Sequence, residues 1–345
     1  MKTILITGGF GYVGSRLTPT LLENGYKVKV IDLCLYGEYG LEALKSHPRY
    51  SSWTNNFELI RGDIRDPDAV TQAMADVDTV IHLAAVSNDP TGDLDETLTR
   101  QVNFDAVGLL VIKAKEAGVT RFINASSSSV FGIKDMADVT EEIEPEPLTF
   151  YSKYKMLSEW IIRAAATDSF CTVNIRPATI CGYSPRQRFD LTVNKLTADA
   201  IRKKCITVHG GKQRRPNVGM NDVVNLYSKL IETERSRING KTFNFGFENY
   251  SIIDIARIIE SELSDIAPTV TIQPVYDNRD YHISSKYIES VLPYKPLSSI
   301  HAEVAELRNM FDKGEFMDID APQYYNLKIM KLDRNPLVFN ILKPN

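Results

Sequence analysis

The chain begins with a short strand-like segment that runs into a glycine-rich turn and then into a helix-forming stretch. Residues 3–7 are apolar or β-branched, and four of the next seven residues are glycines: Gly8, Gly9, Gly11 and Gly14. Glycine lets a backbone turn sharply and approach phosphates, and the N–H groups at a helix N-terminus attract anions. The pattern therefore predicts a dinucleotide pyrophosphate site at the first strand-to-helix turn. The glycines fit both Gly9-x-Gly11-x-x-Gly14 and Gly8-x-x-Gly11-x-x-Gly14, so this motif alone leaves the class of protein open.

Composition narrows the classes to which the chain can belong. Its 345 residues suffice for one large or two smaller domains, and 43% hydrophobic and 24% charged residues are typical of a globular protein. The net charge of −4 argues against non-specific nucleic-acid binding. No stretch approaches the roughly 20 apolar residues of a membrane span, and Gly8 breaks the apolar start too early for a signal peptide. We therefore expect neither a nucleic-acid nor a membrane partner.

Cysteine spacing bears on the cellular compartment. Cys34, Cys171, Cys181 and Cys205 lie far apart and form no C-x-x-C pair. Disulfides and a structural zinc site are therefore not expected, and a reducing compartment fits this usage. We expect a cytoplasmic protein without a bound metal.

Strand and helix patterns alternate through the first half of the chain. Such alternation predicts a parallel sheet covered by helices on both faces, which is a Rossmann-type doubly wound α/β fold. Sheets of this kind bind ligands beyond the carboxyl ends of their strands. We expect strands at residues 3–7, 27–32, 57–61, 79–83, 121–125 and 171–176, and helices at residues 12–23, 67–75, 95–117 and 151–166.

The pattern changes after about residue 176, where prolines and glycines interrupt a loop-rich stretch. We interpret residues 1–181, with a return at about 220–262, as the dinucleotide-binding domain. Residues 182–219 and 263–345 then form a smaller, mixed α/β part that binds the substrate.

Two aspartates follow predicted strands. Asp32 ends the second strand, where its carboxylate can accept hydrogen bonds from ribose hydroxyls and repel a 2′-phosphate, which favours NAD over NADP. The alternative is that Asp32 only caps the next turn. Asp63 follows the third strand, where it can meet the adenine edge, whereas Asp66 precedes Pro67 and is expected to be a helix N-cap.

A tyrosine and a lysine carry the strongest signal for chemistry. Tyr151 and Lys155 are four residues apart and therefore share one face of a helix. A neighbouring ammonium group lowers the pKa of a phenol, so Tyr151 can take a proton from a hydroxyl group of the substrate. One of the serines at 126–129 can hold the same oxygen. The alternative is a surface helix with no role in catalysis.

Taken together, these motifs resemble the extended short-chain dehydrogenase/reductases, and more narrowly their nucleotide-sugar epimerase/dehydratase branch. The matching motifs occur in the same order as in the family, over nearly the whole chain. It rests on TGGFGYVG at 7–14, GDIR at 62–65, HLAA at 82–85, SSSSVFG at 126–132 and the Tyr151-x-x-x-Lys155 pair. In this family the helices at 95–117 and 151–166 commonly pair across a dimer, so the resemblance implies a homodimer.

The resemblance also implies site residues. Ser127, Tyr151 and Lys155 match the catalytic set, and Asn103 matches an Asn that structures the site behind the nicotinamide. NAD contacts are implied for Gly8, Gly11, Tyr12, Val13, Gly14, Asp32, Asp63, Ile64, Leu83, Ala84, Ala85, Asn103, Tyr151, Lys155 and Pro177. Sugar-nucleotide contacts are implied for Ser87, Asn88, Ser128, Ser129, Arg188, Asn194, Arg215 and Arg279. Arg215 and Arg279 each have a surface salt bridge as their alternative role, and Asn88 either faces the sugar or only forms the turn before Pro90.

Departures from the family pattern narrow the expected reaction. The 4,6-dehydratases carry an Asp and a Glu where this chain has Ser128 and Ser129, and a hydroxyl cannot replace those acids near neutral pH. The 3,5-epimerases carry a Cys, and the sugar-nucleotide decarboxylases a Glu, at the position of Ser129. UDP-galactose 4-epimerases have a Lys where this chain has Ser87.

What remains is hydride chemistry at one carbinol. We expect NAD-dependent oxidoreduction, with C4 of a nucleotide-diphospho-sugar favoured, as an epimerase that passes through a transient keto sugar. The first alternative is a net 4-dehydrogenase or 4-keto reductase. The second is a non-catalytic binding member of the family, against which the intact Ser127, Tyr151 and Lys155 set argues.

Overall fold

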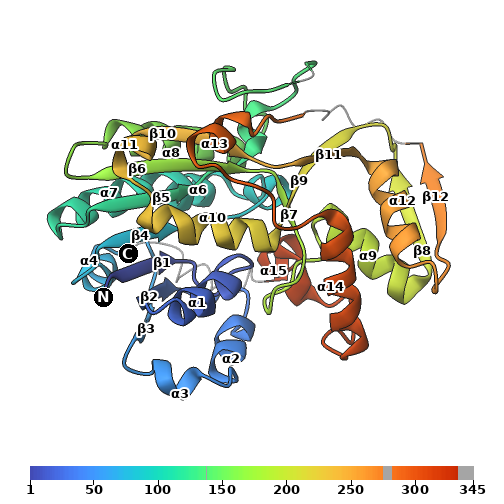
Figure 1. Ribbon diagram of the computed structural model, residues 1–345, viewed down its shortest axis with the longest axis horizontal. Helices are drawn as coiled ribbons and strands as arrows, with labels where there is room; N and C mark the ends of the chain where they lie inside the picture. Colours follow the sequence, from blue (N-terminus) through green and yellow to red (C-terminus); the bar gives the residue numbers. More distant parts are fainter. Residues whose placement is uncertain (137, 275–281, 333–345) are drawn as a thin grey trace.

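A seven-stranded parallel sheet dominates the computed structural model, which describes residues 1–136, 138–274 and 282–332. The strand order is β10-β6-β5-β4-β1-β2-β3, which confirms the predicted doubly wound fold (Figure 1). The chain crosses from one half of the sheet to the other between β3 and β4, so the carboxyl ends of β1 and β4 flank the switch point. The strands are β1 (Thr3–Thr7), β2 (Lys27–Asp32), β3 (Phe57–Arg61), β4 (Thr79–His82), β5 (Arg121–Ala125), β6 (Cys171–Pro177) and β10 (Lys241–Phe245).

Burial on both faces explains why these strands are apolar throughout. Ile4 and Ile6 of β1 belong to one core cluster, whereas Leu5 between them belongs to a second cluster. One face is covered by α1 (Gly14–Glu23) and α10 (Met220–Glu232), and the other by α4 (Pro67–Met74), α7 (Ala106–Glu116) and α8 (Phe150–Ala164). The remaining helices of this half are α2 (Tyr39–Lys45), α3 (Tyr50–Trp53), α5 (Asp89–Gly92), α6 (Glu96–Arg100) and α11 (Arg235–Ile238).

The helix expected at 95–117 forms as three consecutive pieces. Asp95 caps α6 by accepting a hydrogen bond from the Leu98 N–H at 2.9 Å. A π-helical segment, η1 (Gln101–Asp105), then joins α6 to α7. Single π-helical turns within α-helices are frequent at functional sites. This one contains Asn103.

The smaller part packs around a core of its own. It holds a three-stranded sheet, β11-β9-β7, and a two-stranded parallel sheet, β12-β8. The expected return to the main domain reaches only β10, because α12 packs against α9 and α14 of the smaller part rather than against the sheet. These elements are β7 (Thr179–Cys181), β8 (Cys205–His209), β9 (Arg214–Gly219), β11 (Glu248–Ser251), β12 (Thr269–Gln273), α9 (Thr192–Lys203), α12 (Ile252–Glu262) and α14 (Ile300–Asp312).

Three further segments follow or precede α14. The helix α13 (Lys286–Val291) contacts β10, so part of the C-terminal region returns to the main sheet. A 3₁₀ turn, η3 (Pro322–Tyr324), leads into α15 (Asn326–Leu332), which lies against α5 at the edge of the nucleotide-binding half. The helix α15 thus contacts the N-terminal half of the chain.

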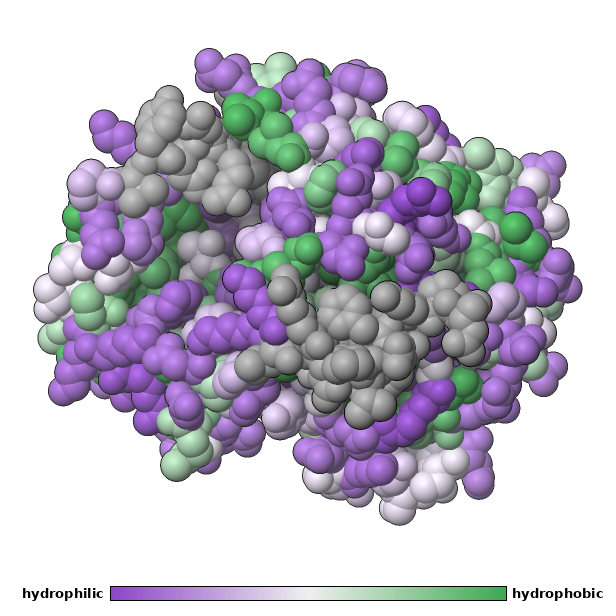
Figure 2. Space-filling model, turned by 180° about the vertical axis from the view of Figure 1, so that it is seen from behind, coloured by the Kyte–Doolittle hydropathy of each residue, from purple (hydrophilic) through white to green (hydrophobic). Residues whose placement is uncertain are grey.

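None of the described helices combines the length and the apolar composition that crossing a bilayer requires. On the face seen in Figure 2, hydrophilic residues predominate and hydrophobic ones occur in small groups among them. Within the described ranges, no group of three or more His, Cys, Asp or Glu side chains is placed to hold a metal ion.

Candidate active site

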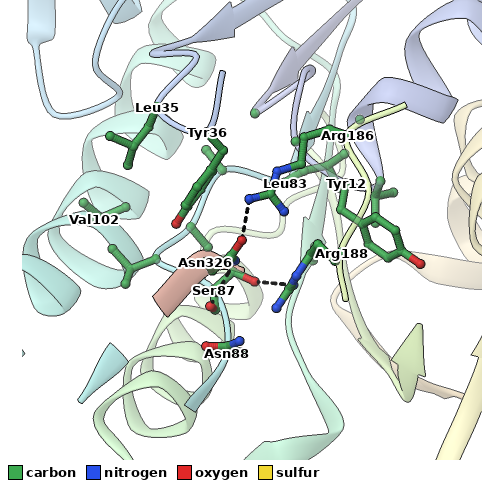
Figure 3. A pocket seen from close by; sticks show the side chains of 18 of the residues that line it. Tyr12, Leu35, Tyr36, Leu83, Ser87, Asn88, Val102, Arg186, Arg188 and Asn326 are labelled. Carbon is green, nitrogen blue, oxygen red and sulfur yellow. Dashed lines mark hydrogen bonds between the residues drawn. The ribbon is translucent and has the colours of Figure 1, made fainter. Parts of the chain in front are cut away.

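A cavity of about 340 Å³ lies at the carboxyl ends of the central strands. Segments from both parts of the chain line it, which Figure 3 shows for the region around Arg186 and Arg188. The structure brings most of the predicted site residues to this cavity: Gly8, Gly11, Tyr12, Val13, Gly14, Asp32, Asp63, Ile64, Leu83, Ala84, Ala85, Ser87, Asn88, Ser127, Ser128, Ser129, Tyr151, Lys155, Pro177 and Arg188.

The glycine loop allows other backbone segments to approach it closely. Gly8 has a φ of +73°, and a Cβ there would lie 2.8 Å from the backbone nitrogen of Ala84. A Cβ on Gly14 would lie 2.6 Å from the backbone of Gly9, and one on Gly9 would meet the Val30 side chain of β2 instead of the cavity. The spacing that lines the cavity is therefore Gly8-x-x-Gly11-x-x-Gly14. This cradle at the start of α1 suits a pyrophosphate.

Asp32 stands beside the loop at the end of β2. Its Oδ2 accepts a hydrogen bond from the Phe10 N–H at 2.8 Å, and its Oδ1 accepts one from the Cys34 N–H at 2.7 Å. Burial raises the pKa of Asp32, and these two N–H groups oppose that rise. A carboxylate fixed in this way keeps further lone pairs for ribose hydroxyls.

Asp63 is held within its own loop. Arg65 binds its carboxylate, with Nη2 at 2.6 Å from Oδ2 and Nε at 3.1 Å from Oδ1, while Arg65 Nη1 donates to Gln101 at 2.8 Å. Asp63 thus lines the cavity as one half of an ion pair. The neighbouring prediction is confirmed, because Asp66 caps α4 by accepting from the Asp68 N–H.

Local structure fixes where Tyr151 lies on α8. A capping box formed by Thr149 and Ser152 starts the helix, and the Thr149 hydroxyl donates to Asp89 of α5 at 2.6 Å. Gly92 of α5 lies against the tyrosine, since a Cβ there would be 2.7 Å from the Tyr151 Cβ. The small residue therefore lets α5 pack directly on the first turn of α8.

Lys155 lies one turn further along α8. Its Nζ donates to the carbonyl oxygen of Ala125 at 2.7 Å, and its side chain is buried. Burial lowers the pKa of Lys155 to about 8, and the nearby Glu159 carboxylate opposes that shift. The ammonium group is still the predominant form at pH 7, so a positive charge remains beside the cavity.

The serine loop follows β5. Ser127 caps a 3₁₀ turn, η2 (Ser128–Phe131), and its Oγ lies 2.9 Å from the Ser129 Oγ. Ser126 also lines the cavity, and its hydroxyl donates to Glu159, which pairs with Arg176 at 2.7 Å. All four serines of this loop line the cavity, and positions 127–129 hold no carboxylate or thiol.

Two predicted site residues, Asn103 and Asn194, are buried and do not line the cavity. Asn103 is buried and holds the backbone of Val86 at both ends, accepting from its N–H and donating to its carbonyl oxygen at 2.9 Å each. Asn194 is fully buried: it accepts from the Gly182 N–H at 2.8 Å and donates to the Tyr12 hydroxyl and the Arg188 carbonyl, both at 2.9 Å. The expected contact of Asn194 with the sugar nucleotide stays a prediction; in this structure protein groups engage its amide.

The structure describes one of the two arginines expected further along the chain. Arg215 lies on β9, opposite Tyr250 of β11, and is not among the residues that line the cavity. Arg279 lies outside the described residues. Among the three predicted arginines, Arg188 does line the cavity. Its guanidinium pairs with Asp190 at 2.8 and 3.1 Å and reaches the Ser87 hydroxyl at 3.1 Å.

Sequence reasoning missed several lining residues. Tyr36 follows β2, Arg186 precedes Arg188, and Tyr227 comes from α10 near Tyr151. Asn326 and Met330 come from α15, and the Asn326 amide reaches the Ser87 carbonyl at 3.4 Å. The Arg-x-Arg pair directly after Pro185 was the one sequence signal for these missed residues. No local pattern indicates that α15 packs against the cavity.

Similar proteins of known sequence share part of this architecture. A protein of Sinorhizobium fredii named "Uncharacterized protein y4nG" is 35% identical over 184 residues, which is 53% of this chain and 42% of that protein. UDP-glucuronic acid decarboxylase 1 of Xenopus tropicalis is 28% identical over 268 residues, 75% of this chain and 60% of the relative. The chain thus spans about half the length of these curated relatives.

Solved structures match over nearly their whole length. UDP-glucuronic acid 4-epimerase from Bacillus cereus, solved with UDP-glucuronic acid and NAD, is 27% identical with a TM-score of 0.77, covering 89% of this chain and 99% of that one. The dTDP-glucose 4,6-dehydratase DesIV from Streptomyces venezuelae has a TM-score of 0.79 at 22% identity, covering 92% of this chain and 99% of that one, and shows the same fold.

A family model matches residues 4–246, more than half of the chain. The family description names NAD, which confirms the cofactor predicted from the glycine loop and Asp32. With the fold, the glycine cradle and the Tyr151–Lys155 pair in place, the chain belongs to the NAD dependent epimerase/dehydratase family.

Proposed function

We propose that this protein oxidises and re-reduces one carbinol of a nucleotide-diphospho-sugar, with C4 as the reacting carbon, and so acts as an epimerase. The observation that carries this proposal is the residue set around the cavity: Ser127, Tyr151 and Lys155 without a carboxylate or thiol at 128 or 129. The similarity to a 4-epimerase, at 27% identity over 89% of the chain, supports it.

Each residue has a defined task in this reaction. Tyr151 takes the proton of the sugar hydroxyl and later returns it. The Lys155 ammonium favours the phenolate form of Tyr151, and Ser127 orients the reacting oxygen. NAD, held by the glycine cradle and Asp32, supplies the acceptor for the hydride. Both faces of the keto sugar must then be presented in turn, which requires that the sugar rotate within the cavity.

Elimination and decarboxylation fit the site less well. Both require a further acid or base, or a carboxylate, at the positions of Ser128 and Ser129, and hydroxyl groups do not titrate near neutral pH. One relative is named a decarboxylase, but the similarity to it is 28% and spans 60% of its length. A net 4-dehydrogenase or 4-keto reductase remains the second candidate, because the same three residues suffice for it.

The Tyr151→Phe variant tests the assignment. We expect it to lose about 10²- to 10⁴-fold in turnover, the usual contribution of a general base, while it still binds NAD⁺. Tyr154→Phe is the matched control, because Tyr154 lies on the same helix and donates to Glu96 at 3.0 Å, away from the cavity. Equal turnover in wild type and Tyr151→Phe would exclude Tyr151 as the base.

The redox state of the cofactor separates the two candidates. An epimerase regenerates NAD⁺ in every cycle, so the absorbance at about 340 nm stays low while the sugar is converted. A net dehydrogenase accumulates one NADH for each sugar oxidised. A screen of UDP-, GDP-, CDP- and dTDP-sugars in which no sugar is converted would favour the non-catalytic alternative.

We also propose a cytoplasmic homodimer that forms through α7 and α8. Both helices carry large apolar side chains at the surface: Ile112 is 55% exposed and Trp160 is 47% exposed. Aromatic side chains such as that of Trp160 are enriched at protein–protein interfaces. Light scattering of the purified protein tests this, and a monomer mass at micromolar concentration would contradict it.

A further inference from the structure

Arg186 is a buried cation without an acidic partner. Its side chain is 2% exposed and lines the cavity, yet no carboxylate among the described residues lies within ion-pair distance of it. Nη2 donates to the Asn326 Oδ1 at 2.6 Å, and Nε has no hydrogen-bond partner. Arg188, two residues on, differs because Asp190 neutralises it at 2.8 Å.

Such an arrangement is costly in the free protein. A buried charge normally requires a paired counter-charge, and an unpartnered buried N–H group adds a further penalty. Burial lowers the pKa of Arg186 to about 10, and the positive charge of Arg188 acts in the same direction. An anion brought in by a ligand would relieve both penalties.

Contacts of the same segment place Arg186 next to the glycine loop. The Ser184 hydroxyl donates to the Tyr12 carbonyl at 2.6 Å, and the Tyr12 hydroxyl donates to the Gly182 carbonyl at 2.8 Å. Arg16 of α1 adds a third link, to the Tyr183 carbonyl at 3.1 Å. Residues 182–184 are thus fastened to the turn where a pyrophosphate is expected.

Two side chains fix the direction of the guanidinium. Its Cζ lies 4.3 Å from the ring centroid of Tyr36, which belongs to the loop after Asp32, and α15 holds its Nη2 through Asn326. Figure 3 shows Arg186 and Arg188 projecting from one segment into the cavity, toward Asn326 and Ser87 respectively. Arg186 therefore lies beside the loop that follows Asp32, on a segment that is hydrogen-bonded to the glycine loop.

We propose that Arg186 binds the diphosphate group of the dinucleotide, so that the C-terminal part of the chain completes the cofactor site. The guanidinium supplies a planar pair of donors, which matches phosphate oxygens, and Tyr36 and Asn326 orient it. This inference rests on the dinucleotide cofactor but not on the sugar reaction. The diphosphate of a sugar nucleotide has the same chemistry and is the competing source.

Arg186→Gln is the test, with binding of NAD⁺, ADP-ribose and UDP-glucose measured by calorimetry. We expect the Kd for NAD⁺ to rise about 10- to 100-fold, since a hydrogen bond to a charged group is lost. The Kd for ADP-ribose should rise by the same factor, because ADP-ribose contains the same diphosphate group. UDP-glucose binding to NAD-saturated protein should change less than threefold. Arg308→Gln is the control, because Arg308 pairs with Asp312 and Asp265 away from the cavity.

The stability of the cofactor-free protein separates binding from a structural role. Because Arg186 is an unpaired buried charge, Arg186→Gln should leave the melting temperature of the free protein unchanged or higher and should reduce the rise caused by NAD⁺. A lower melting temperature with an unchanged NAD⁺ increment would overturn the proposal. So would weaker UDP-glucose binding with an unchanged Kd for NAD⁺. Binding needs no turnover, so a wild type inactive on every sugar would refute the proposed function and leave this inference open to the same measurement.

Discussion

The Lys155 ammonium group donates to the carbonyl oxygen of Ala125 at 2.7 Å, which ties α8 to the end of β5. Ala125 is the last residue before the serine loop, so this bond sets the position of the lysine relative to Ser127. The same lysine is buried four residues after Tyr151. One hydrogen bond thus aligns the helix that carries Tyr151, the proposed base, with the loop that carries Ser127.

Stability should rise with pH above about 8 because of Lys155. Its pKa in the folded protein is about 8, against an ordinary value near 10.5, so in this window the unfolded chain binds a proton that the folded chain has released. The folded state therefore gains up to about 1.4 kcal/mol per pH unit between about pH 8 and 10.5. Urea unfolding of wild type and Lys155→Met at pH 7.5, 8.5 and 9.5 measures this. Parallel pH dependences in the two proteins would show that Lys155 does not titrate there.

His82 should make the protein sensitive to acid. Its Nδ1 lies 2.7 Å from the Thr7 hydroxyl, and burial, helped by the Lys155 charge, lowers its pKa to about 3. Between about pH 6.5 and 3 the unfolded chain takes up a proton that the folded chain does not, so stability falls as the pH falls. His82→Gln should lose less stability than wild type between pH 6.5 and 4.5. The comparison uses the slope of unfolding free energy against pH in each protein, measured by urea unfolding. The substitution also changes the unfolding free energy at pH 7, so the absolute values are not compared.

Gly8→Ala should damage the cofactor site, whereas Gly25→Ala should not. Both glycines have positive φ, +73° and +82°, so each alanine meets about 1–2 kcal/mol of backbone strain. Only at Gly8 would the new Cβ also lie 2.8 Å from the backbone of Ala84, while at Gly25 no atom lies within 4 Å. We expect Gly8→Ala to unfold at lower urea concentration and to bind NAD⁺ more weakly than Gly25→Ala. Equal NAD⁺ affinity in the two variants would show that the glycine loop accommodates a Cβ at position 8 without losing the cofactor site.

Asn194→Asp should destabilise the fold rather than remove a substrate contact. The carboxylate can still accept from the Gly182 N–H, but it cannot donate to the Tyr12 hydroxyl or to the Arg188 carbonyl. We expect a loss of about 1–3 kcal/mol in unfolding free energy and weaker NAD⁺ binding, because Tyr12 belongs to the glycine loop. A variant with wild-type stability and NAD⁺ affinity that binds only the sugar nucleotide more weakly would support the direct role predicted from sequence.

Local features of the chain were sufficient to predict one half of the site. Gly8 and Gly14 mark the first turn because only glycine allows that conformation and that approach, and Asp32 ends its strand within the same βαβ unit. Tyr151 and Lys155 are four residues apart, so helical geometry alone places them together. These relations span a few residues or one supersecondary unit, and a sequence pattern records them directly.

Tertiary structure decided the other half. Arg186 meets Asn326 across 140 residues of sequence, and Asn194 meets Tyr12 across 182, so no local spacing indicates either pair. Whether an amide faces a ligand or a buried hydroxyl depends on which distant groups need a partner once water is excluded. The sequence by itself determined the fold, the glycine cradle and the spacing of Tyr151 and Lys155 on one helix face. Only the packing of the C-terminal part against the glycine loop decided which arginine enters the cavity unpaired.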